Sequence, residues 1–75
     1  MPIPKIYTKI AHRIVTLRKE QGISQERLAA EAKINRAHMG HIEQGKKRPT
    51  VETLEKIAYA LHVSLIDLFQ VNNPQ

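Results

Sequence analysis

The 75-residue sequence contains no cysteine, and this absence removes several classes of protein at once. Without thiols the chain forms no disulfide, no thiolate metal site and no cysteine nucleophile. Its longest apolar stretches span only a few residues, whereas a membrane-crossing helix needs about 20. The first residues, Met1–Lys5, lack the apolar core of a secretory signal peptide. We therefore expect a soluble, cytoplasmic protein with no membrane partner.

The chain is too short for two hydrophobic cores, so we expect one domain. A domain of this size buries only about 60% of the surface of its unfolded chain, and dimerisation often supplies additional stability. We expect residues 1–5 to form an N-terminal arm, residues 6–69 the domain, and residues 70–75 a flexible tail.

Acidic residues are scarce in two segments of the chain, although the net charge is only +5. Residues 1–19 hold five cations and no acid, and residues 33–48 hold five cations and one acid. From residue 49 onward, one cation faces three acids. A one-sided basic surface suits a polyanion such as nucleic acid. On charge alone, an ordinary solvated basic surface is an equally good interpretation.

No stretch alternates with the period of a strand, and apolar residues instead recur three and four apart, as in Ile6, Ile10, Ile14 and Leu17. The sequence therefore predicts an all-α fold. Side chains that cap helices and glycines that end them predict five helices at about residues 5–21, 25–32, 36–44, 51–61 and 65–69. His62 is expected to adopt the left-handed conformation after the fourth helix. The inward faces are predicted to carry Leu28, Ala29, Ala32, Met39, Ile42, Leu54, Ile57, Ala58 and Leu61.

The second and third predicted helices, at about residues 25–44, are joined by a short turn and match a helix-turn-helix unit. In such units the second helix enters the major groove of DNA and contacts base edges with its N-terminal residues. A helix pair alone is a weak indication, because small helical bundles contain many of them.

Four motifs in order make this indication specific: Gly22–Ala29 (GISQERLA), Ile42–Gly45 (IEQG), Arg48–Thr50 (RPT) and Leu54–Leu61 (LEKIAYAL). Together they resemble the Cro/repressor (XRE-like) family over about residues 6–69, without a gap. The resemblance implies a compact five-helix, lambda-repressor-like domain that binds operator DNA, usually as a homodimer. The start of the third helix and Gly40 also resemble restriction–modification controller proteins, which regulate their own operon.

The resemblance implies that four residues of the third helix face the bases: Arg36, Ala37, His38 and His41. Helical spacing agrees independently, because Met39 and Ile42 point inward. Arg36 can donate two hydrogen bonds to guanine, and Ala37 offers only an apolar contact to a thymine methyl.

The resemblance also implies that Gln25 contacts a phosphate at the start of the second helix, where free amides attract an anion. Lys46, Lys47 and Arg48 are expected to lie along the phosphate chain, and Thr50 adds a hydroxyl or an amide. Arg18 and Glu43 match a family ion pair between the first and third helices, which is a structural role.

Five apolar residues near the C-terminus exceed what one short helix buries: Leu65, Ile66, Leu68, Phe69 and Val71. We expect a homodimer contact at Leu65, Ile66, Phe69 and Val71. The alternative, that all five pack inside the monomer, stays open.

We expect no enzyme, no cofactor and no metal. His38 and His41 lie three apart on one helix, but no further ligand has a suitable spacing. A different class of function also stays open, namely an antitoxin that binds a protein toxin and represses its own operon. A third possibility is a DNA-binding head separated from its sensor domain.

Overall fold

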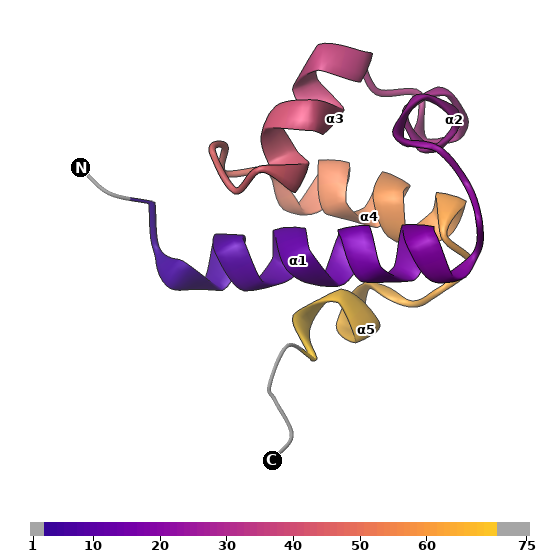
Figure 1. Cartoon of the computed structure of the whole chain (residues 1–75). Coiled ribbons are helices and arrows are strands. Elements are labelled where there is room, and N and C mark those ends of the chain that lie inside the picture. Colours follow the sequence, from indigo (N-terminus) through magenta and orange to yellow (C-terminus); the bar gives the residue numbers. More distant parts are fainter. Residues whose placement is uncertain (1–2, 71–75) are drawn as a thin grey trace.

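The computed structural model describes residues 3–70, which form helices and no strand. The helices are α1 (Lys5–Glu20), α2 (Gln25–Ala32), α3 (Arg36–Glu43), α4 (Val51–Ala60) and α5 (Leu65–Phe69) (Figure 1). This confirms the all-α prediction and the residue at which each helix begins. Three helices end one residue earlier than expected, because Gln21, Gln44 and Leu61 act as C-caps.

The helix starts are fixed by side chains that satisfy free backbone amides, as the sequence predicts. Ser24 and Thr50 each accept a hydrogen bond from the amide three residues later. Ser64 and Asp67 form a complete capping box at the start of α5. Each such cap stabilises its helix by about 1 kcal/mol.

Four residues adopt the left-handed conformation at the ends of helices. Gly22, Gly45 and His62 were expected there, and their φ angles are 71°, 74° and 61°. Lys33, with φ 58°, was not expected, because lysine has no special tolerance for this region.

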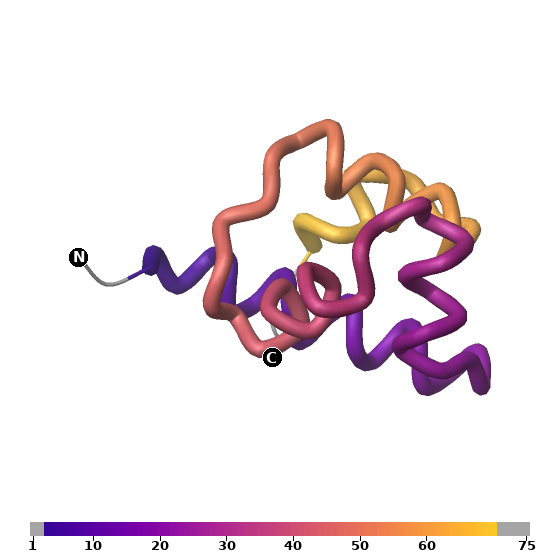
Figure 2. Tube along the Cα trace, turned by 90° about the horizontal axis from the view of Figure 1, so that it is seen from above, coloured from indigo at the N-terminus to yellow at the C-terminus, as the bar shows by residue number. Residues whose placement is uncertain are grey.

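α1 contacts both α3 and α5, while α4 contacts α2 and α5. In Figure 1, α3 lies above α1 and α5 lies below it. Figure 2 shows that residues 44–50, between α3 and α4, run as an extended arc along one side of the molecule. α3 and this arc therefore lie next to each other on the surface.

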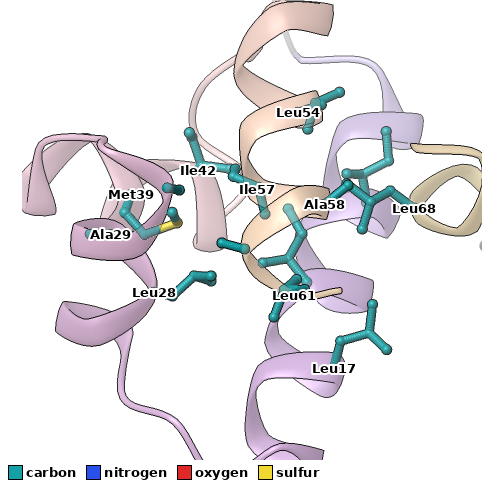
Figure 3. Close-up of a cluster of buried hydrophobic side chains, with 14 residues drawn as sticks. Leu17, Leu28, Ala29, Met39, Ile42, Leu54, Ile57, Ala58, Leu61 and Leu68 are labelled. Atoms are coloured by element: carbon teal, nitrogen blue, oxygen red, sulfur yellow. The ribbon is translucent and has the colours of Figure 1, made fainter. Parts of the chain in front are cut away.

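The core is formed by fourteen apolar residues that come from all five helices and from the C-cap of α4 (Figure 3). They are Ile10, Ile14, Leu17, Leu28, Ala29, Ala32, Met39, Ile42, Leu54, Ile57, Ala58, Ala60, Leu61 and Leu68. This set includes every inward residue predicted for the second, third and fourth helices.

Ile6 is the exception among the apolar residues of α1, since it is 40% exposed. Its helical spacing placed it on the same face as Ile10 and Ile14. The first turn of α1, however, projects beyond α4 and α5 in both views (Figures 1 and 2).

We predict that Ile57→Ala, at a fully buried position of α4, lowers the free energy of unfolding by about 2–5 kcal/mol, because it leaves a cavity in the core. Val51→Ala in the same helix changes an exposed residue and should cost less than about 0.5 kcal/mol. Urea denaturation followed by circular dichroism measures both, and equal losses would contradict the described core.

Candidate nucleic-acid interface

A three-residue turn joins α2 to α3. Lys33 ends α2, and its amide donates to the carbonyl of Ala30 at 3.1 Å. The amide of Ile34 donates to the carbonyl of Ala29 at 2.9 Å. These bonds satisfy carbonyls at the end of α2 while the left-handed residue redirects the chain. Ile34 packs against the core, so the turn is anchored to the body of the domain.

The start of α3 is fixed by Asn35. Its Oδ1 accepts hydrogen bonds from the amides of Ala37 and His38, at 2.8 and 3.2 Å. Met39 and Ile42 are 0% and 2% exposed, so they fix the inward side of the helix. The opposite side of α3 therefore faces solvent.

The solvent side of α3 carries three of the four predicted base-reading residues. Arg36, Ala37 and His41 are exposed, whereas His38 is partly buried. The structure thus brings the first three onto one accessible surface and leaves His38 less accessible than expected.

A buried carboxylate holds α3 against the rest of the domain. The Nε of Arg18 donates to Oε2 of Glu43 at 2.9 Å, and Nη2 donates to Oε1 at 3.2 Å. Arg18 also donates through Nη1 to the carbonyl of Ile23 at 3.0 Å. The side chains of Arg18 and Glu43 are only 13% and 4% exposed. The ion pair between the first and third helices is therefore present, as the sequence resemblance implied.

Gln25 belongs to the same network, which the sequence did not predict. Its Nε2 donates to Oε1 of Glu43 at 3.0 Å. The contact joins residues 18 apart on two helices, so no local pattern indicates it. One hydrogen of the Gln25 amide is therefore engaged inside the protein. A phosphate contact at this position would use the second hydrogen and the free backbone amides at the start of α2.

The segment that follows α3 presents three cations to solvent. The amide of Lys46 donates to the carbonyl of His41 at 3.0 Å, which ties the segment to the end of α3. Lys46, Lys47 and Arg48 are exposed, and Pro49 is buried. Within residues 3–70, these three cations make no ion pair. They are therefore available to an external anion beside the exposed side of α3.

Thr50 has a structural task at the same place. Its hydroxyl accepts from the amide of Thr53 at 3.1 Å and donates to the hydroxyl of Thr53 at 3.0 Å. Because both functions of the hydroxyl are engaged, a phosphate contact of Thr50 would rely on its backbone amide.

The exposed side of α3 is hollowed where it meets the start of α2. The hollow is lined by Gln25, Arg36, Ala37, Gly40, His41 and Gln44. Gly40 contributes the lack of a side chain, and a glycine inside a helix is about 0.5–1 kcal/mol less favourable than alanine.

Three of the seven acidic residues line a different surface. Glu31, Glu52 and Glu55 lie along a groove between α2 and α4, together with Lys33 and Lys56. The exposed side of α3 and the segment after it carry basic and neutral side chains. The charge distribution of the fold therefore favours an anionic partner at α3.

Among residues 3–70 there is no group of three or more histidine, aspartate or glutamate side chains that could hold a metal ion. In the same part of the chain, no helix combines the length and the apolar character that crossing a bilayer requires.

Comparison with known proteins supports the interpretation of this surface. Residues 14–68 match the family model described as "Helix-turn-helix". The chain belongs to this helix-turn-helix family. The matched region contains α2, α3 and α4 in full, and therefore the whole candidate interface.

Relatives of this helix-turn-helix protein are transcriptional regulators and controller proteins. It is 38% identical over 52 residues to an HTH-type transcriptional regulator of Sinorhizobium fredii, covering 69% of this chain and 68% of the relative. It is 35% identical over 65 residues to the control protein C.MunI of a Mycoplasma species, covering 85% and 88% of the two chains. These similarities confirm the Cro/repressor-type resemblance.

The fold is similar to that of the restriction–modification controller protein C.AhdI from Aeromonas hydrophila. The TM-score is 0.83 at 29% sequence identity, and the match covers 87% of this chain and 98% of the other. The helix-turn-helix protein thus shares its whole described architecture with a controller protein.

We predict that Glu43→Ala destabilises the domain by about 3–5 kcal/mol, because it leaves the largely buried guanidinium of Arg18 without its counter-charge. Glu43→Gln keeps the oxygen that accepts from Gln25 and should cost less. Urea denaturation compares the two variants. Replacing both partners together, as Arg18→Met with Glu43→Leu, should recover much of the lost stability, and no recovery would contradict the role of the pair.

Proposed function

We propose that this helix-turn-helix regulator binds an inverted-repeat operator in double-stranded DNA as a homodimer and controls its own operon. It would act as a restriction–modification controller or as a phage-type repressor, in the cytoplasm, where its DNA is found. The observation that carries this proposal is the accessible side of α3, flanked by Lys46–Arg48, whose cations make no ion pair with any of residues 3–70.

Base recognition in this proposal depends mainly on Arg36. It is exposed at the first position of α3, the end of a recognition helix that reaches base edges. Its guanidinium can donate two parallel hydrogen bonds to O6 and N7 of one guanine. His41 lies on the same exposed side and can donate one bond to a base or a phosphate. Ala37 and the partly buried His38 complete the proposed reading surface.

Phosphate binding in this proposal comes from both sides of α3. Lys46, Lys47 and Arg48 follow the helix and are exposed. Gln25 and the free amides of α2 precede it, and Thr50 offers an amide at the start of α4. Contacts of this kind give affinity that falls with salt and carries no sequence information.

Dimerisation in this proposal uses α5. Ile66 and Phe69 are 68% and 42% exposed, so two large apolar side chains of this short helix are available to a partner. Leu68 is fully buried and Leu65 packs against the core, so these two serve the monomer first. Val71 lies outside the described residues. In a symmetric dimer formed through Ile66, the two copies of α3 would bind two half-sites about one turn of DNA apart.

The comparisons give no support to the antitoxin alternative, and no observation on residues 3–70 favours it. The proposed partner of this protein is therefore operator DNA together with a second copy of the chain.

We predict that Arg36→Ala weakens binding to the selected operator by about 1–3 kcal/mol and relaxes preference at one base pair in each half-site. The operator is first obtained by selection from random DNA, and affinities are then measured by fluorescence anisotropy. Equal losses on operator and random DNA would show that Arg36 does not read bases.

We predict a different signature for Lys47→Ala. Its affinity should fall alike on all sequences, and the slope of log K against log salt should decrease by about 1 for each site. Lys56→Ala, an exposed lysine on the acidic groove of α4, is the matched control and should change neither quantity. A sequence-dependent loss for Lys47→Ala would contradict its assignment to phosphate.

We predict that Ile66→Asp converts a dimer into a monomer in sedimentation equilibrium at tens of micromolar protein, because each interface would receive two buried like charges. The Ile66→Asp monomer should keep the helical content of the wild type and still unfold cooperatively, since Ile66 is exposed and does not belong to the core. Tyr59→Asp is the control, because Tyr59 is 82% exposed on the α2 side of α4. A monomeric wild type would contradict the proposed dimer, and loss of the dimer with Tyr59→Asp but not with Ile66→Asp would place the interface elsewhere.

A further inference from the structure

Gly40 is a glycine that the fold does not need. It lies inside α3, where glycine is unfavourable. Its φ is not in the left-handed region, which among the glycines holds only Gly22 and Gly45. A Cβ atom built on Gly40 would lie 3.4 Å from Oε1 of Gln25, an ordinary contact with a side chain. Alanine therefore fits at this position in the free protein.

The space above Gly40 lies at the centre of the proposed reading surface. Ala37 and Gly40 stand one helical turn apart and form the floor of the hollow. Longer polar side chains of Gln25, Arg36, His41 and Gln44 complete the lining, and Oε1 of Gln25 lies nearest to the space above Gly40. The hollow therefore combines two residues with little or no side chain and four polar side chains, on the side of α3 that is proposed to face the major groove.

The backbone amides of Ala37 and Gly40 already have hydrogen-bond partners inside the protein. The amide of Ala37 donates to Oδ1 of Asn35, and the amide of Gly40 lies within the helix ladder of α3. The Nε2 of Gln25 donates to Glu43. The remaining donors of the hollow therefore belong to the side chains around Ala37 and Gly40, such as Arg36 and His41, whereas an apolar group seated on Ala37 and Gly40 would break no backbone hydrogen bond.

We propose that this hollow receives the C5-methyl group of a pyrimidine, thymine in unmodified DNA, and that Gly40 determines specificity at that base pair. The inference rests on the proposed function. The C5-methyl is the one apolar group that base pairs display in the major groove. Arg36, on the rim, would read a neighbouring guanine. Because 5-methylcytosine carries its methyl at the same place, operator binding would also respond to cytosine methylation.

The first test replaces each thymine of the selected operator by deoxyuridine, one position at a time, since this removes only the methyl group. We expect one thymine in each half-site whose replacement weakens wild-type binding about fourfold, the contribution of one buried methyl. A second comparison places cytosine or 5-methylcytosine at the position of that thymine. Affinity for the 5-methylcytosine operator should exceed affinity for the cytosine operator by a similar factor.

The second test uses Gly40→Ala, which fills the floor with a methyl group of the protein. We expect this variant to unfold at a higher temperature than wild type and to bind the thymine and uracil operators equally. Each operator pair serves as its own control for folding and for general affinity.

The outcomes separate this inference from the function on which it rests. Wild-type binding that is indifferent to uracil at every thymine, or a Gly40→Ala variant that keeps the wild-type ratio, would overturn the role of the hollow while leaving operator binding intact. A chain that enriches no DNA sequence at all would overturn the proposed function and this inference together.

Discussion

The carboxylate of Glu43 joins three helices of this protein, and the geometry of the candidate interface depends on it. It accepts hydrogen bonds from Arg18 of α1 and from Gln25 of α2, while its own backbone ends α3. The angle between α2 and α3 is therefore fixed both at the turn between them and at the far end of α3. A buried charge held in this way is stable only while its partner is present. The same carboxylate thus links the stability of the domain to the orientation of its reading surface.

Most of the fold could be predicted from the sequence because it depends on local signals. The caps at Ser24, Asn35 and Thr50 act within three residues, and apolar periodicity identifies the inward faces. The left-handed conformation of Lys33 was missed because lysine has no special preference for it; it accompanies the hydrogen bonds that the amides of Lys33 and Ile34 donate to carbonyls at the end of α2. The bond from Gln25 to Glu43 was missed because it joins positions that only the fold brings together. Ile6 was misplaced because periodicity does not reveal where the neighbouring helices end.

Several side chains assigned to DNA by resemblance also have tasks inside the protein. Thr50 caps α4 with its hydroxyl, and Gln25 donates to Glu43. Lys46–Arg48, in contrast, have no ion-pair partner among the described residues. Substitutions at the first two positions would therefore change the scaffold as well as any phosphate contact. The three cations are the cleaner reporters of electrostatic binding, and this distinction follows from the contacts and not from the resemblance.

α5 packs against α1 and is also hydrogen-bonded to it, because the Nε of Arg13 donates to the carbonyl of Asp67 at 3.2 Å. Arg18, further along α1, holds α3. A helix of 16 residues is about 24 Å long and hardly bends over that length. α1 therefore forms a rigid connection between the proposed dimer contact on α5 and the proposed reading helix α3. In a dimer formed through α5, α1 would therefore set the distance between the two copies of α3. A small change in the angle between the subunits at Ile66 would change that distance, and with it the half-site spacing that the dimer binds best.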